Sequence, residues 1–229
     1  MVRGRARGRP VYRAGLTMVL RSLLALGGFA LGGTTAALLS PAGAPHAVTA
    51  APAAHVAAIA PGRVAVPAAS ARQAQQEGLI LQPIATILSV PGRMHYGDYR
   101  WDDAGVPKGP VWVRVDLQSQ IVSVFRGQHE IGTAVILYGA EGLPTPTGKF
   151  PVLAKLKDHR SQTYDAPMPY TLRLTADGVS IHASNVRWGY ATHGCVGVPE
   201  EFARKLFGAV SVGDPVLVVG ADAFRKPTA

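Results

Sequence analysis

The stretch ATHGCVGV, residues 191–198, contains the single cysteine of a 229-residue chain. Cys195 directly follows His193 and Gly194, and another histidine, His182, lies upstream in the segment SIHAS. A cysteine attacks as its thiolate, and a nearby imidazolium and backbone amides lower its pKa. Both histidines are candidates for the base that activates Cys195, and their spacing leaves the choice open.

The glycine before the cysteine suits an oxyanion hole. Gly194 permits a tight turn that would direct the amides of Gly194 and Cys195 at one point, where a tetrahedral oxyanion would sit. The alternative is that Cys195 is a small buried apolar residue, which is common for an unpaired cysteine. A single thiol cannot form an intramolecular disulfide, and in an exported protein it is a liability unless buried or used. The combination of thiol, glycine and histidines favours chemistry.

The order of residues along the chain restricts the class of enzyme. All seven histidines precede Cys195, whereas papain-like peptidases that hydrolyse the cell wall place the cysteine first. A sortase-type transpeptidase using His129, Cys195 and Arg204 is an alternative, although THGC is not the strand context expected there.

The remaining histidines do not predict a metal centre. His95, His129 and His159 lack ligand spacing, and the sequence contains no HExxH motif or paired cysteines. We interpret these three as surface or structural residues and expect neither a metal nor another cofactor.

Strands must position the candidate residues. VWVRVDL, residues 111–117, alternates apolar residues with Trp112, Arg114 and Asp116, which is typical of a strand with one face in the core. Turns are predicted at Ser119-Gln120 and Arg126-Gly127. Further strands are predicted within 121–125, 129–138, 143–156, 170–174, 178–183 and 210–219.

One helix is clear from the sequence. PEEFARKLFGA, residues 199–209, has Pro199 at its first position, acidic residues in its first turn and Gly208 near its end. We therefore predict a mainly β domain over residues 111–220 with one or two short helices, followed by a tail at 221–229.

The N-terminal region has the pattern of an export signal. The first 45 residues contain six arginines and no acidic residue, and residues 22–39 carry no charge. This pattern predicts a signal peptide or signal anchor over residues 1–40, with residues 16–39 available to anchor the chain in the inner membrane and the remainder exported to the periplasm or cell wall. A buried core helix is the alternative. Because most of the net charge of +9 lies here, we expect no nucleic-acid partner.

Two segments connect this signal to the β domain. Residues 41–75 are rich in Ala, Pro and Val, which predicts a disordered linker that cannot build a core. Residues 76–110 are rich in turn residues and aromatics, and we interpret them as an ordered lead-in of unknown role.

The motifs together resemble those of the L,D-transpeptidases, whose catalytic domain is of the YkuD type. The resemblance covers about residues 111–219 and is carried by SIHAS, THGC, DLQSQIVSVFRG, PTPTGKF and VGDPVLV. It implies a β-sandwich or barrel-like fold and a cysteine enzyme that acts on peptidoglycan stem tetrapeptides and releases D-alanine. The acyl group would pass to an amine, giving a 3-3 crosslink, D-amino acid exchange or attachment of a wall-anchored protein.

The resemblance also assigns roles to individual residues. Cys195 would be the nucleophile and His182 the general base, oriented by the backbone carbonyl of Ala183. The backbone amides of His193, Gly194 and Cys195 would form the oxyanion hole, and Thr192 would steady this loop. Tyr164 and Trp188 are candidates for the substrate groove, with ordinary packing as the alternative.

The sequence departs from the family pattern at two places. Gly197 stands where Arg or Asn is frequent, and Arg187 and Arg173 are candidates to replace that side chain. The segment from His182 to Thr192 is shorter than usual, with Ala183 where Gly is common. Two further alternatives therefore stay open, an L,D-carboxypeptidase that uses water as acceptor and a catalytically silent scaffold that binds the cell wall.

Overall fold

The computed structural model describes residues 2–3 and 61–220, whereas residues 1, 4–60 and 221–229 are not described. The signal segment predicted at residues 1–40 falls outside the described residues except for Val2–Arg3, and the predicted tail at 221–229 falls outside them entirely. None of the helices in the described ranges is both long and apolar enough to cross a membrane.

Most of the described chain forms β-sheets. The strands of the main sheet are β2 (Arg63–Ala65), β3 (Thr86–Leu88), β4 (Tyr99–Trp101), β5 (Val111–Asp116), β6 (Ile121–Arg126), β7 (His129–Val135), β8 (Gly148–Pro151) and β14 (Pro215–Val219). Their order is β2-β3-β7-β6-β5-β14-β8, and β4 pairs with β7 off this path. The turns predicted at Ser119-Gln120 and Arg126-Gly127 are confirmed, because they separate the antiparallel strands β5, β6 and β7.

A second sheet carries the residues of the THGC region. Its strands are β9 (Ala154–Arg160), β10 (Pro167–Arg173), β11 (Ser180–Ala183) and β13 (Val196–Val198), in the order β13-β11-β10-β9. A short third sheet pairs β1 (Val2–Arg3) with β12 (Tyr190–Ala191). An isolated bridge between Leu137 and Gly197 links the second sheet to the segment that follows β7.

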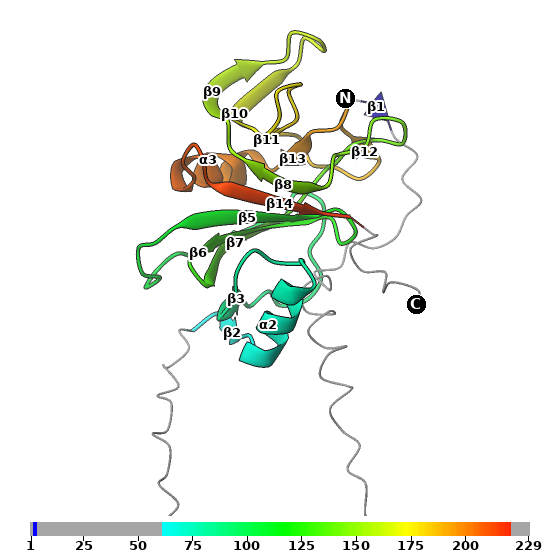
Figure 1. The fold of residues 1–229 in the computed structure, drawn as a ribbon. Helices are drawn as coiled ribbons and strands as arrows, with labels where there is room; N and C mark the ends of the chain where they lie inside the picture. Colours follow the sequence, from blue (N-terminus) through cyan, green and yellow to red (C-terminus); the bar gives the residue numbers. More distant parts are fainter. Residues whose placement is uncertain (1, 4–60, 221–229) are drawn as a thin grey trace, which may run out of the picture.

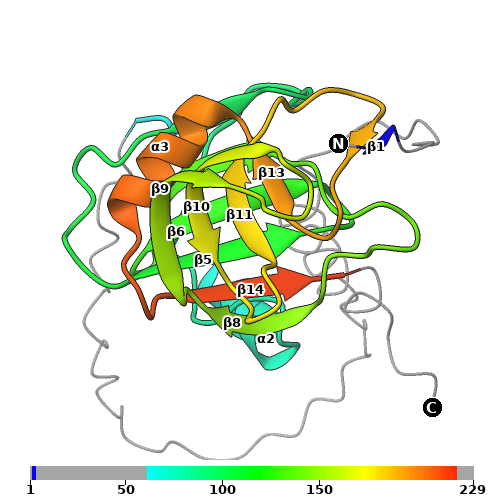
Figure 2. The ribbon, with the colours of Figure 1, turned by 90° about the horizontal axis from the view of Figure 1, so that it is seen from above.

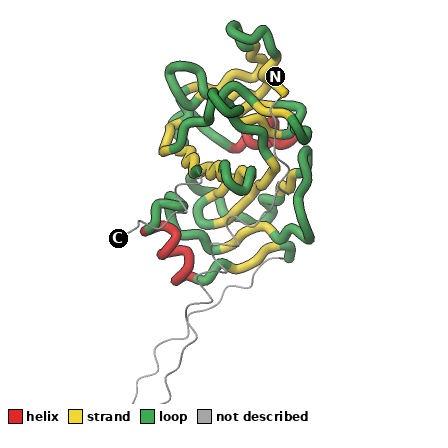
Figure 3. Tube along the Cα trace, turned by 90° about the vertical axis from the view of Figure 1, so that its right-hand side faces the viewer, coloured by secondary structure: helices red, strands yellow, loops and turns green. Residues whose placement is uncertain are grey.

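Two helices complete the described part, α2 (Ala68–Gln76) and α3 (Glu200–Ala209). The main sheet lies between the second sheet with α3 on one side and α2 on the other (Figure 1). Seen from above, β10 and β11 cross over β5 and β14 (Figure 2). In the side view, one helix lies at the lower left and the other lies in the upper half, below the loops at the top (Figure 3). The predicted mainly β fold with one or two short helices is confirmed.

Strand β5 is buried on both faces, which the alternating pattern did not predict. Val113 and Val115 belong to the core cluster between the main sheet, the second sheet and α3. Trp112, on the opposite face, stacks on Phe125 with ring centroids 4.2 Å apart and belongs to a separate core cluster that also contains Ala74 of α2. The outward face expected from the sequence is therefore covered by the chain upstream.

This covering corrects the predicted boundary of the linker. Residues 41–75 were expected to be a disordered linker, but Arg63–Ala65 form β2 and Ala68–Gln76 form α2. Alanine has the highest helix propensity, and its small side chain allows a helix to approach a sheet closely. Ala71 and Ala74 are accordingly buried against the main sheet, while residues 41–60 lie outside the described residues.

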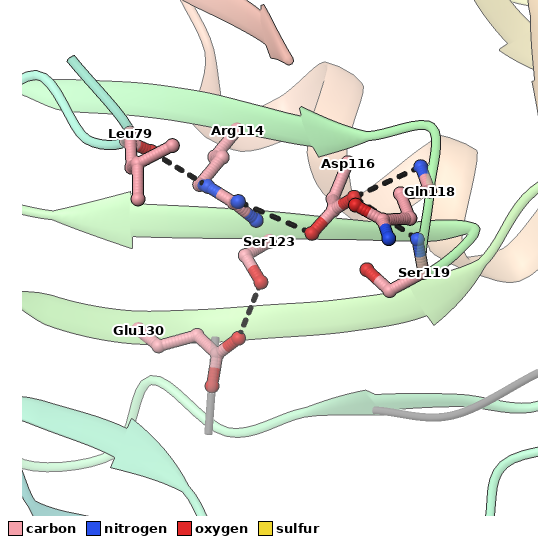
Figure 4. Close-up of polar contacts among 7 residues, drawn as sticks. All are labelled: Leu79, Arg114, Asp116, Gln118, Ser119, Ser123 and Glu130. Atoms are coloured by element: carbon pink, nitrogen blue, oxygen red, sulfur yellow. Dashed lines mark hydrogen bonds and ion pairs between the residues drawn. The ribbon is translucent and has the colours of Figure 1, made fainter. Parts of the chain in front are cut away.

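Buried charges also hold the upstream layer in place. Arg114 and Asp116 are 2% and 0% exposed and form an ion pair with an N–O distance of 3.1 Å. Arg114 Nε donates to the carbonyl oxygen of Leu79 at 2.8 Å, and Asp116 Oδ1 accepts from the amides of Gln118 and Ser119 (Figure 4). Arg114 therefore connects the segment after α2 to the turn between β5 and β6.

Glu130 of β7 makes a second buried connection to the upstream layer. Its Oε1 accepts from the hydroxyl of Ser123 at 2.7 Å (Figure 4), and its Oε2 accepts from the amide of Leu88 at 2.7 Å. Arg63 of β2 donates to the carbonyl oxygen of Glu130 at 2.6 Å. The predicted lead-in thus contributes strands and hydrogen bonds to the main sheet.

Helix α3 forms where the sequence predicted it. It begins at Glu200, one residue after the predicted start at Pro199, and ends at Ala209 rather than at Gly208. Phe202 and Leu206 share its buried face, and the Phe202 ring meets Trp101 edge-on with centroids 5.6 Å apart. The helix therefore packs its apolar face against strands of the core.

Candidate active site

Cys195 lies immediately before β13, next to the strand that carries His182. Strands β11 and β13 pair in parallel, with Ile181 opposite Val196 and His182 opposite Gly197. By this register, Cys195 is level with the first residue of β11. Parallel pairing of two short strands therefore brings together two motifs that are separated along the chain.

The His182 side chain is held in one orientation. His182 is 8% exposed, and its Nδ1 lies 2.8 Å from the carbonyl oxygen of Ala183, which is the contact predicted for Ala183. A carbonyl oxygen only accepts hydrogen bonds, so Nδ1 carries the hydrogen and Nε2 is left as a proton acceptor. Burial lowers the pKa of His182, the hydrogen bond with Ala183 raises it, and the charge of His159 lowers it. The ring is neutral at neutral pH.

The Cys195 thiol is free and partly buried. Its Sγ lies 3.9 Å from the carbonyl oxygen of Gly178. Burial raises the pKa of the Cys195 thiol above its ordinary value, a backbone hydrogen bond with Ser180 lowers it, and the charge of Asp177 raises it. Because burial is the largest of these effects, the resting site pairs a neutral thiol with a neutral imidazole. This differs from the thiolate next to an imidazolium considered from the sequence.

The loop from Thr192 to Cys195 is closed by a hydrogen bond. The Thr192 hydroxyl donates to the carbonyl oxygen of Cys195 at 2.5 Å. The Thr192 amide donates to Tyr138, and its carbonyl accepts from the amide of Ala140. Gly194 has φ +108, a conformation that side chains disfavour. Thr192 and Gly194 thus shape the loop.

The loop amides are available as donors. In the described part of the chain, the amides of His193, Gly194 and Cys195 donate to no backbone carbonyl or side-chain acceptor. Buried or half-buried amides are rarely left without an acceptor in a protein. Free amides at a turn next to a nucleophile are suited to holding a developing oxyanion.

The His193 ring has an aromatic partner. It stacks on Tyr164 with centroids 4.0 Å apart and planes 11° apart. Tyr164 comes from the loop between β9 and β10 and is 48% exposed. Within residues 61–220, neither His182 nor His193 forms a hydrogen bond with Cys195. The orientation of the two rings favours His182 as the base, since its Nδ1 is fixed while the His193 ring packs on Tyr164.

Of the other predicted substrate-binding residues, Arg187 and Trp188 lie in the exposed segment between β11 and β12, and Arg173 is the last residue of β10. Trp188 is 61% exposed, and the Arg187 Nε donates to Asn185 of the same loop at 2.7 Å. Arg173 donates to two carbonyl groups of the turn after β10, those of Thr175 and Ala176. The hydrogen bonds of Arg187 and Arg173 are thus local, and in the described chain neither residue is bonded to the THGC loop.

His159 and His129, both interpreted from the sequence as surface or structural residues, have different surroundings. His159 is close enough for its charge to affect His182. His129 bonds Thr86 through Nδ1 at 2.9 Å, and Arg204 pairs with Glu201 on α3, so the sortase-type arrangement is not formed. The electrostatic effects of His159 on His182 and of Asp177 on Cys195 could not be predicted from the sequence. They depend on how β9 and the turn between β10 and β11 lie relative to the site.

Comparison with known proteins identifies the family of the β domain. Residues 110–218 match the family model of YkuD, the L,D-transpeptidase catalytic domain. L,D-transpeptidase 1 of Mycobacterium tuberculosis is 31% identical over 123 residues, which cover 45% of this chain and 48% of that protein. Probable L,D-transpeptidase 3 of the same organism is 29% identical over 108 residues, 39% of each chain. The chain therefore spans less than half the length of these curated relatives.

A solved structure is also similar to this chain. A crystal structure of an L,D-transpeptidase from Stackebrandtia nassauensis has 25% sequence identity and a TM-score of 0.46, covering 54% of this chain and 60% of that chain.

Proposed function

Residues 110–218 form a YkuD domain, the L,D-transpeptidase catalytic domain, and from this premise we propose that the protein is a cysteine-dependent peptidoglycan L,D-transpeptidase. Its donor substrate is a stem tetrapeptide that ends in D-alanine. The observation that carries the proposal is the fixed His182 ring, with Nδ1 bonded to Ala183 on the strand paired with the one that follows Cys195.

The first half-reaction forms a thioester. Nε2 of His182 accepts the thiol proton while Sγ of Cys195 attacks the carbonyl carbon before D-alanine. The loop amides hold the oxyanion of the tetrahedral intermediate. The imidazolium then donates its proton to the departing nitrogen, the C–N bond breaks, and D-alanine leaves with an acylated Cys195.

The second half-reaction regenerates the thiol. An amine attacks the thioester carbonyl, His182 accepts a proton from the amine, and the imidazolium returns the proton to Sγ as the C–S bond breaks. The amine is the side chain of a second stem peptide, a free D-amino acid or a lysine of a wall-anchored protein. Water in the same position would make the enzyme an L,D-carboxypeptidase.

The pKa directions support base catalysis by His182. Burial raises the pKa of Cys195 and lowers that of His182, so little thiolate exists before substrate binds. Proton transfer therefore accompanies attack, and the Sγ that rests near the carbonyl of Gly178 has to turn towards Nε2. Catalytic contacts are often long in the absence of substrate.

The proposed reaction requires the β domain to meet the cell wall. We propose that the chain is exported to the periplasm or cell wall, and that residues 16–39 hold it at the inner membrane. Peptidoglycan stem peptides are then its main partners.

Mass spectrometry of the full chain incubated with muropeptide tetrapeptides tests this function. We expect release of D-alanine and an acyl adduct on Cys195, and both should be lost in Cys195→Ala and His182→Ala. His95→Ala is a matched control because the His95 side chain is exposed and its ring contacts Asp98. Muropeptide binding without any adduct or D-alanine release would instead identify a silent scaffold. The product formed identifies the acceptor.

A further inference from the structure

Gly197 occupies a position where a side chain has no room. A Cβ at this position would lie 2.7 Å from Oγ and 2.8 Å from Cβ of Ser184, and 3.4 Å from Cβ of Leu137. On the other side, the backbone of Gly197 exchanges two hydrogen bonds with Leu137, of 2.8 and 2.9 Å. The backbone of Gly197 is not left-handed, so glycine is required by space rather than by conformation.

The side chain that fills this space belongs to Ser184, which also reaches His182. Ser184 Oγ lies 3.4 Å from Nδ1 of His182, and the Ser184 amide donates to the carbonyl of Val198 at 2.8 Å. Ser184 is therefore fixed through its backbone to the end of β13 and through its side chain between Gly197 and the His182 ring.

We propose that Ser184 is a positioning residue for His182 and that Gly197 provides the space Ser184 needs, so that the two residues act as a matched pair. This inference rests on the proposed role of His182 as the base. It gives a steric reason for glycine at position 197, where Arg or Asn is frequent in the family that the sequence resembles.

The hydroxyl acts when the His182 ring becomes charged. The Nδ1 hydrogen is donated mainly to Ala183 at 2.8 Å, and Ser184 Oγ is a second, longer acceptor in a three-centre bond. A hydrogen bond from a charged donor is stronger than one from a neutral donor. Because the ring is buried, the imidazolium that forms during attack depends on these two acceptors.

The charged and titratable groups around His182 define the effect of removing the hydroxyl. His159 of β9 disfavours the imidazolium, Cys195 lies before β13, and the charge of Asp177 acts on Cys195. None of these groups replaces an acceptor at Nδ1. Ser184→Ala should therefore lower the pKa of His182 and slow the step in which the ring accepts a proton.

The first test measures acylation of Cys195 in the full chain by imipenem across a pH series. We expect Ser184→Ala to slow acylation about 3- to 10-fold, which is the effect of one hydrogen bond. We also expect the acidic limb of the pH–rate profile to move to lower pH, because the pKa of His182 is lower. Ser184→Thr retains the hydroxyl and should retain most of the rate. Ser89→Ala, a serine of the upstream layer, is the matched control. If Ser184→Ala is acylated at the wild-type rate and the acidic limb of its pH–rate profile does not move, the inference is overturned.

The second test examines the pairing with Gly197. Gly197→Ala should lower the melting temperature, and adding Ser184→Gly should restore it because the colliding Cβ and Oγ are removed. The double variant should still acylate as slowly as Ser184→Gly alone, since the hydroxyl is absent. If Gly197→Ala is equally destabilising with and without Ser184→Gly, the two residues are not a matched pair and the inference fails.

A readout that does not need activity separates this inference from the proposed function. The pKa of His182, followed by NMR of the histidine rings, should be lower in Ser184→Ala than in the wild type. If the wild type is not acylated but this shift is observed, the proposed function fails and the positioning role holds. If the wild type is acylated and the pKa does not change, the positioning role fails and the proposed function holds.

Discussion

The rings of Tyr164 and His193 lie face to face, 4.0 Å apart between centroids. Tyr164 comes from the loop between β9 and β10, whereas His193 is part of the loop that ends in Cys195. The stack is therefore a contact between the second sheet's outer hairpin and the residues whose amides would receive the oxyanion. Since Tyr164 is 48% exposed, its free surface is open to a substrate.

Removing the Tyr164 ring should loosen the THGC loop. We expect Tyr164→Ala to slow acylation of Cys195 by imipenem about 3- to 10-fold, because an aromatic pair contributes about 0.5–1.5 kcal/mol beyond its buried area. Tyr164→Phe keeps the stack and should react at nearly the wild-type rate. An unchanged rate in Tyr164→Ala would show that the stack does not order the loop.

The pH dependence should reveal a neutral resting pair. The pKa of His182 lies below its ordinary 6.5, so the ring can accept a proton at neutral pH. Acylation should therefore fall to half of its maximal rate only below pH 6.5. The pKa of the thiol lies above its ordinary 9.0, so the ultraviolet absorbance of the thiolate should reach half of its maximum only above pH 9.0. Cys195→Ser provides the baseline. Thiolate absorbance at neutral pH would contradict the raised pKa.

The hydroxyl of Thr192 should contribute to loop closure. Thr192→Val has nearly the same shape but cannot donate to the carbonyl of Cys195, and the loss of one such bond costs about 1 kcal/mol. We expect a lower melting temperature and about 5-fold slower acylation. Thr147→Val, at an exposed position in the loop before β8, is the control and should behave as the wild type.

A charge on the buried face of α2 should destabilise the whole described fold. Ala74 is fully buried and belongs to the core cluster of Trp112 and Phe125. Ala74→Asp should lower the free energy of unfolding by more than about 2 kcal/mol, because an unpaired carboxylate is buried. The exposed neighbour Gln76→Asp is the control. Chemical denaturation followed by tryptophan fluorescence measures the free energy of unfolding. If both variants unfold like the wild type, α2 does not contribute to the stability of the fold.

The sequence was most informative where a local pattern specifies the structure. Alternation predicted β5, the turn residues predicted its connection to β6, and proline with two glutamates predicted α3. THGC and SIHAS indicated Cys195 and His182 because their residue types are specific even without a fold. The contact of Ala183 with His182 is a neighbour effect along one strand and needed no long-range information.

The remaining features depend on contacts that no local pattern encodes. The Ala-rich segment before Gln76 has the composition of a linker, and only the apolar face of Trp112 and Phe125 makes it a packed helix. AKLKDHR forms β9 although it is mostly exposed, because its backbone pairs with β10. The fit of Ser184 against Gly197 arises across the pairing of β11 with β13, and neither residue alone indicates the other.

The chain before residue 110 adds β2 and β3 to the edge of the main sheet and packs α2 on the face that carries Trp112 and Phe125, which has a consequence for how this domain can be divided. Residues 110–218 match the family model. A protein that began at residue 110 would expose the side chains of Trp112 and Phe125 to water, because the upstream residues that bury them would be missing. Such an exposed apolar surface favours aggregation. We therefore expect proteolytic trimming and fusion to other modules to be tolerated upstream of β2 rather than at residue 110. The unit that evolution can move intact is larger than the segment that defines the family.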